Sequence, residues 1–383
     1  MKKVLAVTGI RSDYFFSKPI YSAIEKSSKL ELGLVVSGAH LTHFHGYSIN
    51  DVTQDGLNVI AKIDNLLASN SLSSRLKSAS IQMQGLIQVI EQYKPDLLFA
   101  VADREEPMVT AMCGAYLNIP VVHYCAGDRS MGNIDSTVRQ AVSDLSHILL
   151  TTCDDSKQRL LKRGEEAWRI HNVGFAGIDR IKETQALSKE VVESMLGLPR
   201  GHLEEKPYFV VIQHPISSQV EQSFDQMLKT MRVLSQFKDV TFVVSHPNTD
   251  AGSEEIRTVI SDYVKSHDHI HSFSNIDDAV FINLLRGSQG LIGNSSMGVY
   301  EAPYYGLPVL NIGRRQIGRY HSNNMNYVDN DEAEIYSGIK EMLSKTKPEY
   351  FNPFGDGHTA SKIVNILENL EINESLLNKK LVY

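Results

Sequence analysis

Residues 290–305 read GLIGNSSMGVYEAPYY, and this stretch decides the fold class. Its apolar start, Gly290–Ile292, predicts a short buried strand, and Val299–Tyr305 predicts a helix after it. Glycine and serine fill the turn between the two, at Gly293–Gly298. A strand that passes through a short glycine-rich turn into a helix is the repeating unit of an open parallel sheet. The stretch therefore indicates an α/β protein.

The same alternation of short apolar runs and longer amphipathic segments extends along the chain on both sides of this stretch. It predicts strands at 3–7, 32–36, 97–101, 121–124, 147–151, 208–212, 240–244, 270–273 and 309–312, and helices at 80–93 and 103–116. The series breaks at the glycine-punctuated segment 172–177 and then restarts. We therefore predict two doubly wound, Rossmann-like domains facing a cleft, at 1–174 and 175–362. A C-terminal helix or tail at 363–383 can pack back on the first domain.

Composition excludes several classes of protein. The 383 residues include 38 Lys and Arg against 45 Asp and Glu, a formal net charge of −7, which argues against a nucleic-acid partner. No run of about 18 apolar residues occurs, so no membrane span or membrane partner is expected. The apolar stretch behind Lys2 and Lys3 is too short for a signal peptide. Cys113, Cys125 and Cys153 lack CxxC spacing, which argues against disulfides and structural zinc and favours a cytoplasmic location.

Polar residues collect after the predicted strands. Open parallel sheets bind ligands just beyond the carboxyl ends of their strands, so these segments are candidate binding loops. They are Thr8–Asp13, Ser37–His40, Ala102–Glu106, Cys125–Arg129, His214, His246, Asn294–Ser296 and Gly313–Arg315. Both halves of the chain contribute, which predicts one shared cleft.

The loop around Ser295 and Ser296 has two interpretations. Its backbone N–H groups and hydroxyls suit a phosphate or diphosphate, with a helix start behind them and the guanidinium of Arg315 as a bidentate donor. Alternatively, one of the serines only caps the helix. The pattern alone does not choose between the two. Asp103 and Asp135 present the same alternatives, because an acid at a helix start either caps it or performs acid–base chemistry.

Metal and nucleotide cofactors are not indicated. Two histidine clusters lack a carboxylate or cysteine partner at ligand spacing, which argues against a metal site; they are His40, His43 and His45, and His267, His269 and His271. The GxGxxG dinucleotide fingerprint is absent, which argues against NAD. We therefore expect no cofactor.

Several motifs occur in order over most of the chain. They are Thr8–Asp13, Ala102–Arg104, Gly132–Arg139, His214-Pro215, His246–Asn248, Gly293–Pro303, Gly306–Pro308 and Gly313–Arg319. In these motifs the chain resembles the hydrolysing UDP-N-acetylglucosamine 2-epimerases, bacterial enzymes that start sialic-acid-type pathways. The resemblance implies a fold like that of the GT-B glycosyltransferases, with UDP held mainly by the second domain. It also implies a homodimer or homotetramer.

The resemblance further implies the reaction and its residues. UDP leaves from C1 of the sugar, a C2 proton is lost to give a glycal, and water adds to release N-acetylmannosamine. The catalytic residues expected from it are Asp103, Asp135 and His214, to which we add Asp128 as a hypothesis of our own. The residues expected to bind UDP or the sugar are Arg11, Asp13, Arg104, His246, Asn294, Ser295, Ser296, Glu301 and Arg315.

Two departures from the family pattern bear on function. The family carries His-x-Glu-Gly-Gly where this chain has His123-Tyr124-Cys125-Ala126-Gly127, and we hypothesise that Asp128 supplies the missing carboxylate. Phe15-Phe16 stands where relatives carry a small residue and a lysine. These rings either pack in the core or favour a 6-deoxy, 4-acetamido substrate, UDP-N,N'-diacetylbacillosamine of the legionaminic-acid pathway.

Two other functions remain open on the sequence. A GT-B glycosyltransferase shares the nucleotide-sugar domain but needs an acceptor groove. A catalytically silent UDP-sugar sensor is conceivable because Cys125 occupies a catalytic glutamate position.

Overall fold

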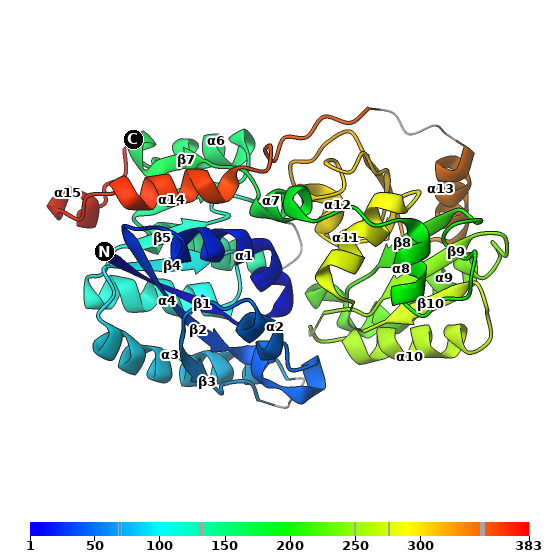
Figure 1. Cartoon of the computed structure of the whole chain (residues 1–383), viewed down its shortest axis with the longest axis horizontal. Helices are drawn as coiled ribbons and strands as arrows, with labels where there is room; N and C mark the ends of the chain where they lie inside the picture. The colour runs from blue at the N-terminus through cyan, green and yellow to red at the C-terminus, as the bar shows by residue number, and fades with distance from the viewer. Residues whose placement is uncertain are drawn as a thin grey trace. The chain divides into compact units, whose positions relative to one another are not determined.

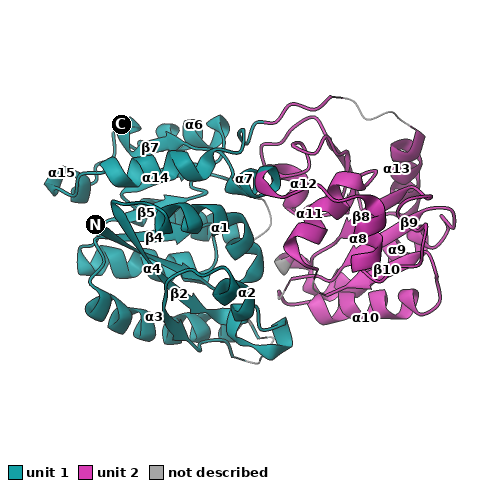
Figure 2. Cartoon of the chain, viewed as in Figure 1, with its two compact units in different colours: residues 1–129, 134–182, 353–383 teal, residues 130–133, 183–352 magenta. Residues whose placement is uncertain are grey.

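The computed structural model describes residues 1–67, 69, 71–129, 134–248, 250–274, 276–344 and 349–382. The chain forms two compact units (Figure 2). Unit 1 contains Met1–Arg129, Ile134–Lys182 and Pro353–Tyr383, and unit 2 contains Glu183–Asn352. Each unit is a parallel sheet covered by helices (Figure 1), which confirms the predicted α/β class with two doubly wound domains.

Unit 1 contains a seven-stranded sheet of order β3-β2-β1-β4-β5-β6-β7, with every pairing parallel. Its strands are β1 Lys2–Thr8, β2 Leu30–Ser37, β3 Val59–Ile63, β4 Leu97–Val101, β5 Val121–Tyr124, β6 Ile148–Thr151 and β7 Ile170–Asn172. Its helices are α1 Arg11–Glu25, α2 Ile49–Gln54, α3 Leu72–Tyr93, α4 Glu105–Leu117, α5 Asp135–Leu145, α6 Asp154–Lys162, α7 Ala176–Glu183, α14 Thr359–Asn369 and α15 Glu374–Leu377. All residues of β4, β5 and β6 are buried, as expected of central parallel strands with helices on both faces.

Unit 2 contains a six-stranded parallel sheet of order β10-β9-β8-β11-β12-β13. Its strands are β8 Tyr208–Ile212, β9 Thr241–Ser245, β10 Ile270–Phe273, β11 Leu291–Gly293, β12 Val309–Ile312 and β13 Met325–Val328. Its helices are α8 Lys189–Met195, α9 Ser223–Leu234, α10 Ser253–Val264, α11 Asp278–Gly287, α12 Met297–Tyr300 and α13 Glu332–Ser344. Aromatic and aliphatic side chains of β8 and β9 pack under α9 and α10 to form the main core.

Strand order reverses at the same point in both units, between β1 and β4 and between β8 and β11. Such a switch point opens a crevice at the carboxyl ends of the two strands, because their connections leave in opposite directions. In unit 2 the two strands approach closely at Gly293, which has φ +120, and a Cβ there would overlap the carbonyl oxygen of Ile212. The loops after β1 and β4 therefore begin at neighbouring strand ends in unit 1, and so do the loops after β8 and β11 in unit 2.

The structure differs from the sequence-based expectations in a few elements. Strands β3, β7 and β13 were not predicted; β3 and β13 are partly exposed edge strands, and β7 has only three residues. They therefore lack the continuous apolar run that marks a central strand. The predicted helix at 299–305 is a four-residue helix, α12, followed by turns. The chain passes between units at Lys182 and Asn352, whereas the sequence placed the boundaries at 174 and 362.

The C-terminal segment belongs to unit 1. Helix α14 lies against α1 (Figure 1), and Lys2 Nζ donates to the carbonyl oxygens of Leu367 at 2.8 Å and Glu368 at 2.9 Å. Arg169 is completely buried and donates to the carbonyl oxygens of Leu376 and Ser375, both at 2.8 Å. Two cations, Lys2 and Arg169, therefore hold the tail by donating hydrogen bonds to its backbone carbonyl oxygens, which any tail sequence would offer.

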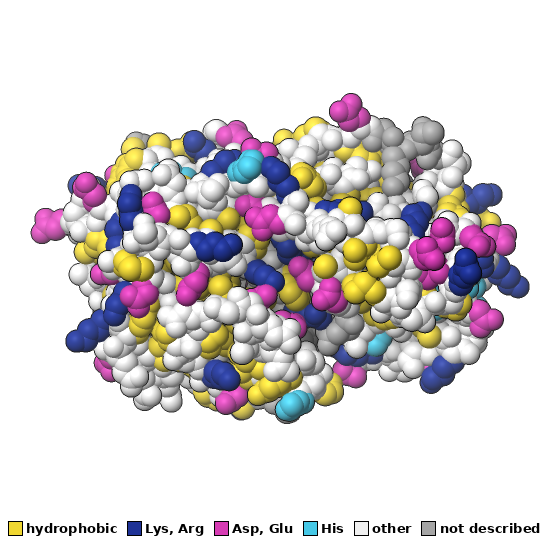
Figure 3. Space-filling view, in the orientation of Figure 1, with side chains coloured by type: hydrophobic (Ala, Val, Ile, Leu, Met, Phe, Trp, Pro, Cys, Tyr) yellow, Lys and Arg dark blue, Asp and Glu magenta, His cyan; other side chains and the backbone are white. Residues whose placement is uncertain are grey.

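Charged side chains of both signs are interspersed on the face shown in Figure 3. In the part of the chain that the structure describes, no helix combines the length and apolarity needed to cross a bilayer.

We expect Arg169→Ala to lower the free energy of unfolding by about 3 kcal/mol, because several buried carbonyls lose their donor and Glu166 loses its partner. Arg163→Ala is the matched control; its ion pair with Asp144 is solvent-exposed, and its loss is expected to cost less than about 1 kcal/mol. Urea unfolding of both variants measures the difference, and equal losses would contradict the assignment of Arg169 as the anchor of the tail.

Candidate active site

The switch point of unit 1 carries a cluster of charged side chains. Asp13 lies in the first turn of α1 after β1, and Arg104 and Glu106 follow β4. Arg104 Nε lies 3.8 Å from Glu106 Oε2 and 4.0 Å from Glu105 Oε2. Glu106 reaches this position because residue 9 is glycine; a Cβ there would overlap its carboxylate. The segments 9–13 and 102–106 thus meet at this edge of the sheet.

The carboxyl groups of this cluster differ in their affinity for protons. Burial raises the pKa of Asp13 to about 7; Arg104 opposes the shift, and the charges of Asp103 and Glu106 add to it. Burial also raises the pKa of Glu106. Burial acts in the same direction on Glu105, but Arg104 and a hydrogen bond from Arg75 outweigh it and lower the pKa of Glu105. Carboxyl groups with separated pKa values are the arrangement that acid–base catalysis uses.

A buried guanidinium connects two of the predicted catalytic aspartates. Arg139 on α5 is buried, donates from Nη2 to Asp103 Oδ2 and places Nη1 3.5 Å from Asp128 Oδ2. Asp135 is the first residue of α5, one helical turn before Arg139. Residues four apart share one face of a helix, so Asp135 and Arg139 project from the same side of α5. Gly132 and Asn133 of this motif lie outside the described residues.

Two strained residues flank the cluster. Ala102 after β4 and Cys125 after β5 have φ values of 63 and 65, in the left-handed region that non-glycine residues rarely adopt. Burial raises the pKa of the Cys125 thiol well above its usual value, and Arg139, Asp128 and Asp103 act on it electrostatically. The position that carries glutamate in the resembled family is thus a neutral thiol beside the same aspartates.

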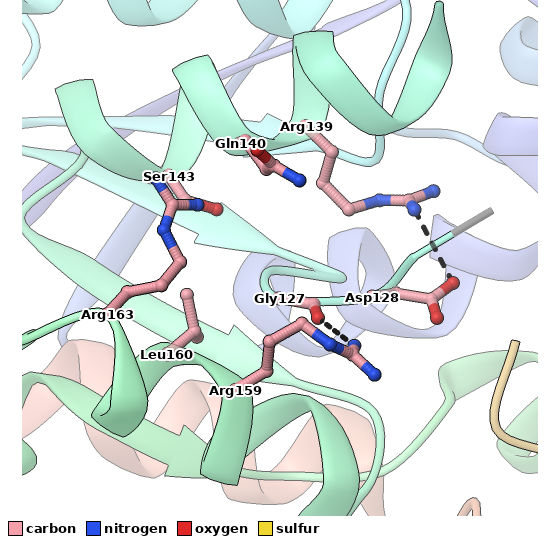
Figure 4. Close-up of a pocket in the computed structure, with 8 residues that line it drawn as sticks. All are labelled: Gly127, Asp128, Arg139, Gln140, Ser143, Arg159, Leu160 and Arg163. Atoms are coloured by element: carbon pink, nitrogen blue, oxygen red, sulfur yellow. Dashed lines mark hydrogen bonds and ion pairs between the residues drawn. The ribbon is translucent and has the colours of Figure 1, made fainter. Parts of the chain in front are cut away.

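Asp128 lines a small pocket (Figure 4). The pocket is lined by Gly127, Asp128, Arg139, Gln140, Ser143, Arg159, Leu160 and Arg163. Arg159 Nη1 donates to the carbonyl oxygen of Gly127 at 2.5 Å, and Asp128 Oδ1 accepts the N–H of Arg129 at 2.7 Å. These bonds orient the carboxylate of Asp128 toward Arg139.

Arg11 and the two phenylalanines lie on the first turns of α1. Arg11 Nε is 3.3 Å from Asp51 Oδ2. The ring of Phe15 lies under the guanidinium groups of Arg11 at 4.9 Å and Arg180 at 5.9 Å. Phe16 packs on Phe175 with ring centroids 5.2 Å apart. Both rings are half-buried, so neither belongs to the fully buried core: Phe16 packs on Phe175, and Phe15 lies beside Arg11.

At the switch point of unit 2, the side chain of Asn294 is hydrogen-bonded to the backbone of His214. Asn294 Oδ1 accepts the backbone N–H of His214 at 2.7 Å, and its Nδ2 donates to the carbonyl oxygen of His214 at 2.9 Å. His214 Nδ1 accepts the N–H of Asn248 at 3.1 Å, so the ring proton is on Nε2. Burial and the charge of Arg315 lower the pKa of His214 to about 3. His214 is therefore a neutral hydrogen-bond donor.

Arg315 and the serines complete this cluster. Arg315 Nη1 and Gln316 Nε2 both donate to the carbonyl oxygen of Asn294, at 3.2 and 2.8 Å. Ser295 Oγ accepts the N–H of Met297 at 3.4 Å, whereas the side chain of Ser296, the N-cap residue, makes no capping hydrogen bond. Helix α12 has only four residues, so the helix dipole expected behind the serines is small.

The remaining predicted residues lie at the edges of these clusters. His246 follows β9 and is half-buried; burial and the charge of Arg257 lower its pKa. Glu301 is buried at the end of α12. His40 bonds to Thr8 Oγ1 at 3.0 Å and to Ser48 Oγ at 2.8 Å, which makes it a structural histidine. Among the described residues, no group of three His, Cys, Asp or Glu side chains has metal-binding geometry.

Sequence reasoning missed two residues of the unit 1 cluster. Arg139 had no assigned role, although its position four residues after Asp135 places both on one face of a helix. Glu106 was quoted only as part of the loop after a strand. No sequence signal indicates that it packs on Gly9, because that contact joins two distant segments.

Comparison with known proteins agrees with the fold and with the motifs. The profile of a family described as UDP-N-acetylglucosamine 2-epimerase matches residues 22–368. The chain belongs to this family of enzymes.

Several relatives align with nearly the whole chain. This chain is 31% identical over 379 residues to a UDP-N,N'-diacetylbacillosamine 2-epimerase (hydrolyzing) of Legionella pneumophila, and the alignment covers 99% of both chains. It is 29% identical to a UDP-N-acetylglucosamine 2-epimerase of Neisseria meningitidis, covering 96% of this chain and 94% of the relative. The crystal structure of a Neisseria meningitidis UDP-GlcNAc 2-epimerase bound to UDP-GlcNAc aligns with a TM-score of 0.79 at 18% identity, covering 95% of this chain and 99% of that one. The structural match confirms the GT-B-like fold.

We expect Asp13→Asn to stabilise the protein at pH 8 by roughly 1–3 kcal/mol relative to the parent chain. Burial raises the folded-state pKa of Asp13 to about 7, above its unfolded value near 3.8, so ionising this carboxyl destabilises the folded state as the pH rises from about 4 to about 7. The stability difference between variant and parent should therefore grow over this range and level off above it.

Urea unfolding at intervals between pH 4.5 and pH 8 measures this difference. Asp64→Asn, at an exposed position, is the control and should track the parent. If the free energy of unfolding of Asp13→Asn ran parallel to that of the parent over this pH range, the raised pKa of Asp13 would be refuted.

Proposed function

We propose that this protein is a hydrolysing UDP-N-acetylglucosamine 2-epimerase, which converts the UDP-sugar to UDP and N-acetylmannosamine. The observation that carries the proposal is the unit 1 cluster, in which Asp103 and Asp128 share the buried Arg139 and Asp13 retains a proton near neutral pH. Several carboxyl groups gathered in one place suit the proton transfers that the reaction needs.

The reaction is written as an elimination followed by a hydration. The C1–O bond to the diphosphate breaks and its electron pair leaves with UDP, while the C2 proton passes to a carboxylate. The resulting glycal has a C1=C2 double bond. Water then gives its hydroxyl to C1, and a proton is returned to C2 from the opposite face, so the configuration at C2 is inverted. No redox step occurs, so the mechanism needs no electron carrier.

UDP is assigned to unit 2. The diphosphate gains negative charge as it leaves, and the Arg315 guanidinium, the His214 Nε2–H and the N–H groups beside Ser295 and Ser296 are donors for that charge. Glu301, as a carboxylate, suits the two ribose hydroxyls. Asn294 holds the His214 backbone in place and supports this arrangement.

The carboxylates of unit 1 are assigned to proton transfer. Asp103 and Asp135 are the proposed acid–base pair, and Asp128 takes the place of the glutamate that Cys125 replaces. Arg11, Asp13 and Arg104 are proposed to contact the sugar or its phosphate. The contact of Asp128 with Arg139 supports its role, because it places Asp128 on the same guanidinium as Asp103.

A second substrate, UDP-N,N'-diacetylbacillosamine, is favoured by one observation. The ring of Phe15 forms apolar surface beside Arg11, where a 6-methyl group would be accommodated better than a hydroxyl. The Legionella pneumophila relative carries this substrate in its name. The chemistry at C1 and C2 is the same for both sugars.

We expect turnover of at least one of these two UDP-sugars, with release of UDP and a 2-epimerised free sugar. Proton NMR of each incubation follows the anomeric signals directly. Release of the sugar with unchanged configuration at C2 would instead support a transferase acting on water. Saturable binding without turnover of either sugar would support the silent sensor and refute the proposal.

We expect Asp103→Asn and Asp128→Asn each to lower kcat by about 100-fold or more, because both remove a proposed proton carrier and leave Arg139 with one partner. Asp144→Asn is the matched control; this aspartate pairs with Arg163 at the exposed surface and should retain activity. Steady-state UDP release measures all three. Wild-type turnover in Asp128→Asn, together with loss in Asp103→Asn, would refute the role of Asp128.

A further inference from the structure

Helix α5 is linked to the loop that carries Asp103 directly through Arg139 and indirectly through Ser143 and His123. Arg139 and Ser143, one turn apart on its buried face, are 3% and 0% exposed. Arg139 donates to the carboxylate of Asp103. Ser143 Oγ lies 3.0 Å from His123 Nδ1, and His123 Nε2 lies 2.8 Å from the carbonyl oxygen of Ala102. The position of α5 therefore determines the position of residues 102 and 103.

The hydrogen bonds of His123 define its tautomer. A carbonyl oxygen only accepts, so Nε2 carries the proton and Nδ1 accepts from the hydroxyl of Ser143. Burial lowers the pKa of His123 to about 3, so the ring stays neutral over the working pH range. Its bond to Ala102 holds a residue at φ 63, a backbone conformation that persists only where neighbours enforce it.

The C-terminal tail holds the other end of α5. Lys379 Nζ donates to the carbonyl oxygens of Ser143 at 2.8 Å and Asp144 at 3.3 Å, and lies 2.9 Å from Glu165 Oε1. These carbonyls belong to the last turn of α5, where Ser143 O also accepts the N–H of Ser146 at 3.2 Å, and a cation there interacts favourably with the helix dipole. Glu165 is buried and compensates the charge of Lys379. The tail backbone around Lys379 is in turn fixed by Arg169.

We propose that Lys379 is a positioning residue for the reaction: by holding the C-terminal turn of α5 it keeps Ser143 and Arg139 in register, so that His123 and Arg139 fix the Ala102–Asp103 segment. The inference rests on the proposed function only in taking Asp103 as catalytic. Lys379 contacts the far end of α5, so it acts through the helix and not on substrate. A displacement of about 1 Å at a reacting group is enough to lower a rate severely.

The test compares Lys379→Met, Lys379→Arg and Lys380→Met in the full-length chain. Lys380 is exposed and adjacent in sequence, so its variant is the matched control. We expect Lys379→Met to lower kcat about 10-fold with KM within about twofold, because geometry at the reacting carbon changes while UDP binding does not. Lys379→Arg retains charge and donors and should restore at least half of the lost activity, and Lys380→Met should match the parent.

Hydrogen–deuterium exchange gives a readout that does not depend on turnover. Lys379→Met should speed exchange in the peptides covering α5 and residues 101–104, and Lys380→Met should not. An increase confined to the tail, or wild-type kcat in Lys379→Met, would overturn the proposal. If the parent chain turns over neither UDP-sugar, the exchange result still decides whether Lys379 positions residues 102 and 103.

Discussion

The buried guanidinium of Arg139 is the interaction on which the unit 1 site depends. Moving a cation out of water costs several kcal/mol unless carboxylates compensate it, and here Asp103 and Asp128 do so. The three residues come from α5 and from the loops after β4 and β5. One ion-pair network therefore fixes three segments at the same time, and two of the proposed catalytic groups owe their orientation to it.

The two units share a strand order but carry different polar groups at their switch points. At the switch point of unit 1, the carboxyl groups of Asp13, Glu105 and Glu106 interact with Arg104. Two further guanidinium groups take part, because Arg75 pairs with Glu105 and Arg139 pairs with Asp103. At the switch point of unit 2, the charged group is Arg315, beside a neutral histidine and amide donors. The guanidinium and the neutral donors of unit 2 suit a diphosphate, whereas the carboxyl groups of unit 1 suit proton transfer. The proposed division of roles between the units follows this difference.

Sequence was a good guide wherever one local pattern decides the structure. Apolar runs such as 97–101 and 208–212 match strands to the residue, because central parallel strands are buried on both faces. The edge strand Met325–Val328 was not predicted, because half-exposed strands contain both polar and apolar residues. The role of Arg139 was not predicted for a different reason. Its partners Asp103 and Asp128 are 36 and 11 positions away in the chain, and only the fold brings them together. The loop after Gly293 was placed correctly at the sheet edge, but its helix is too short for the expected dipole.

The neutral thiol at position 125 is compatible with acid–base chemistry because of the charge balance around Arg139. Asp103 and Asp128 already present two carboxylates to one guanidinium, and the charge of Asp13 also reaches the thiol. A third carboxylate at position 125 would make the ionisation of each neighbour more costly in this buried setting. The left-handed backbone at Cys125 turns the chain so that Asp128, three residues later, reaches Arg139. The loop thus carries a carboxylate at position 128 instead of position 125, and Arg139 compensates the charge of this buried anion.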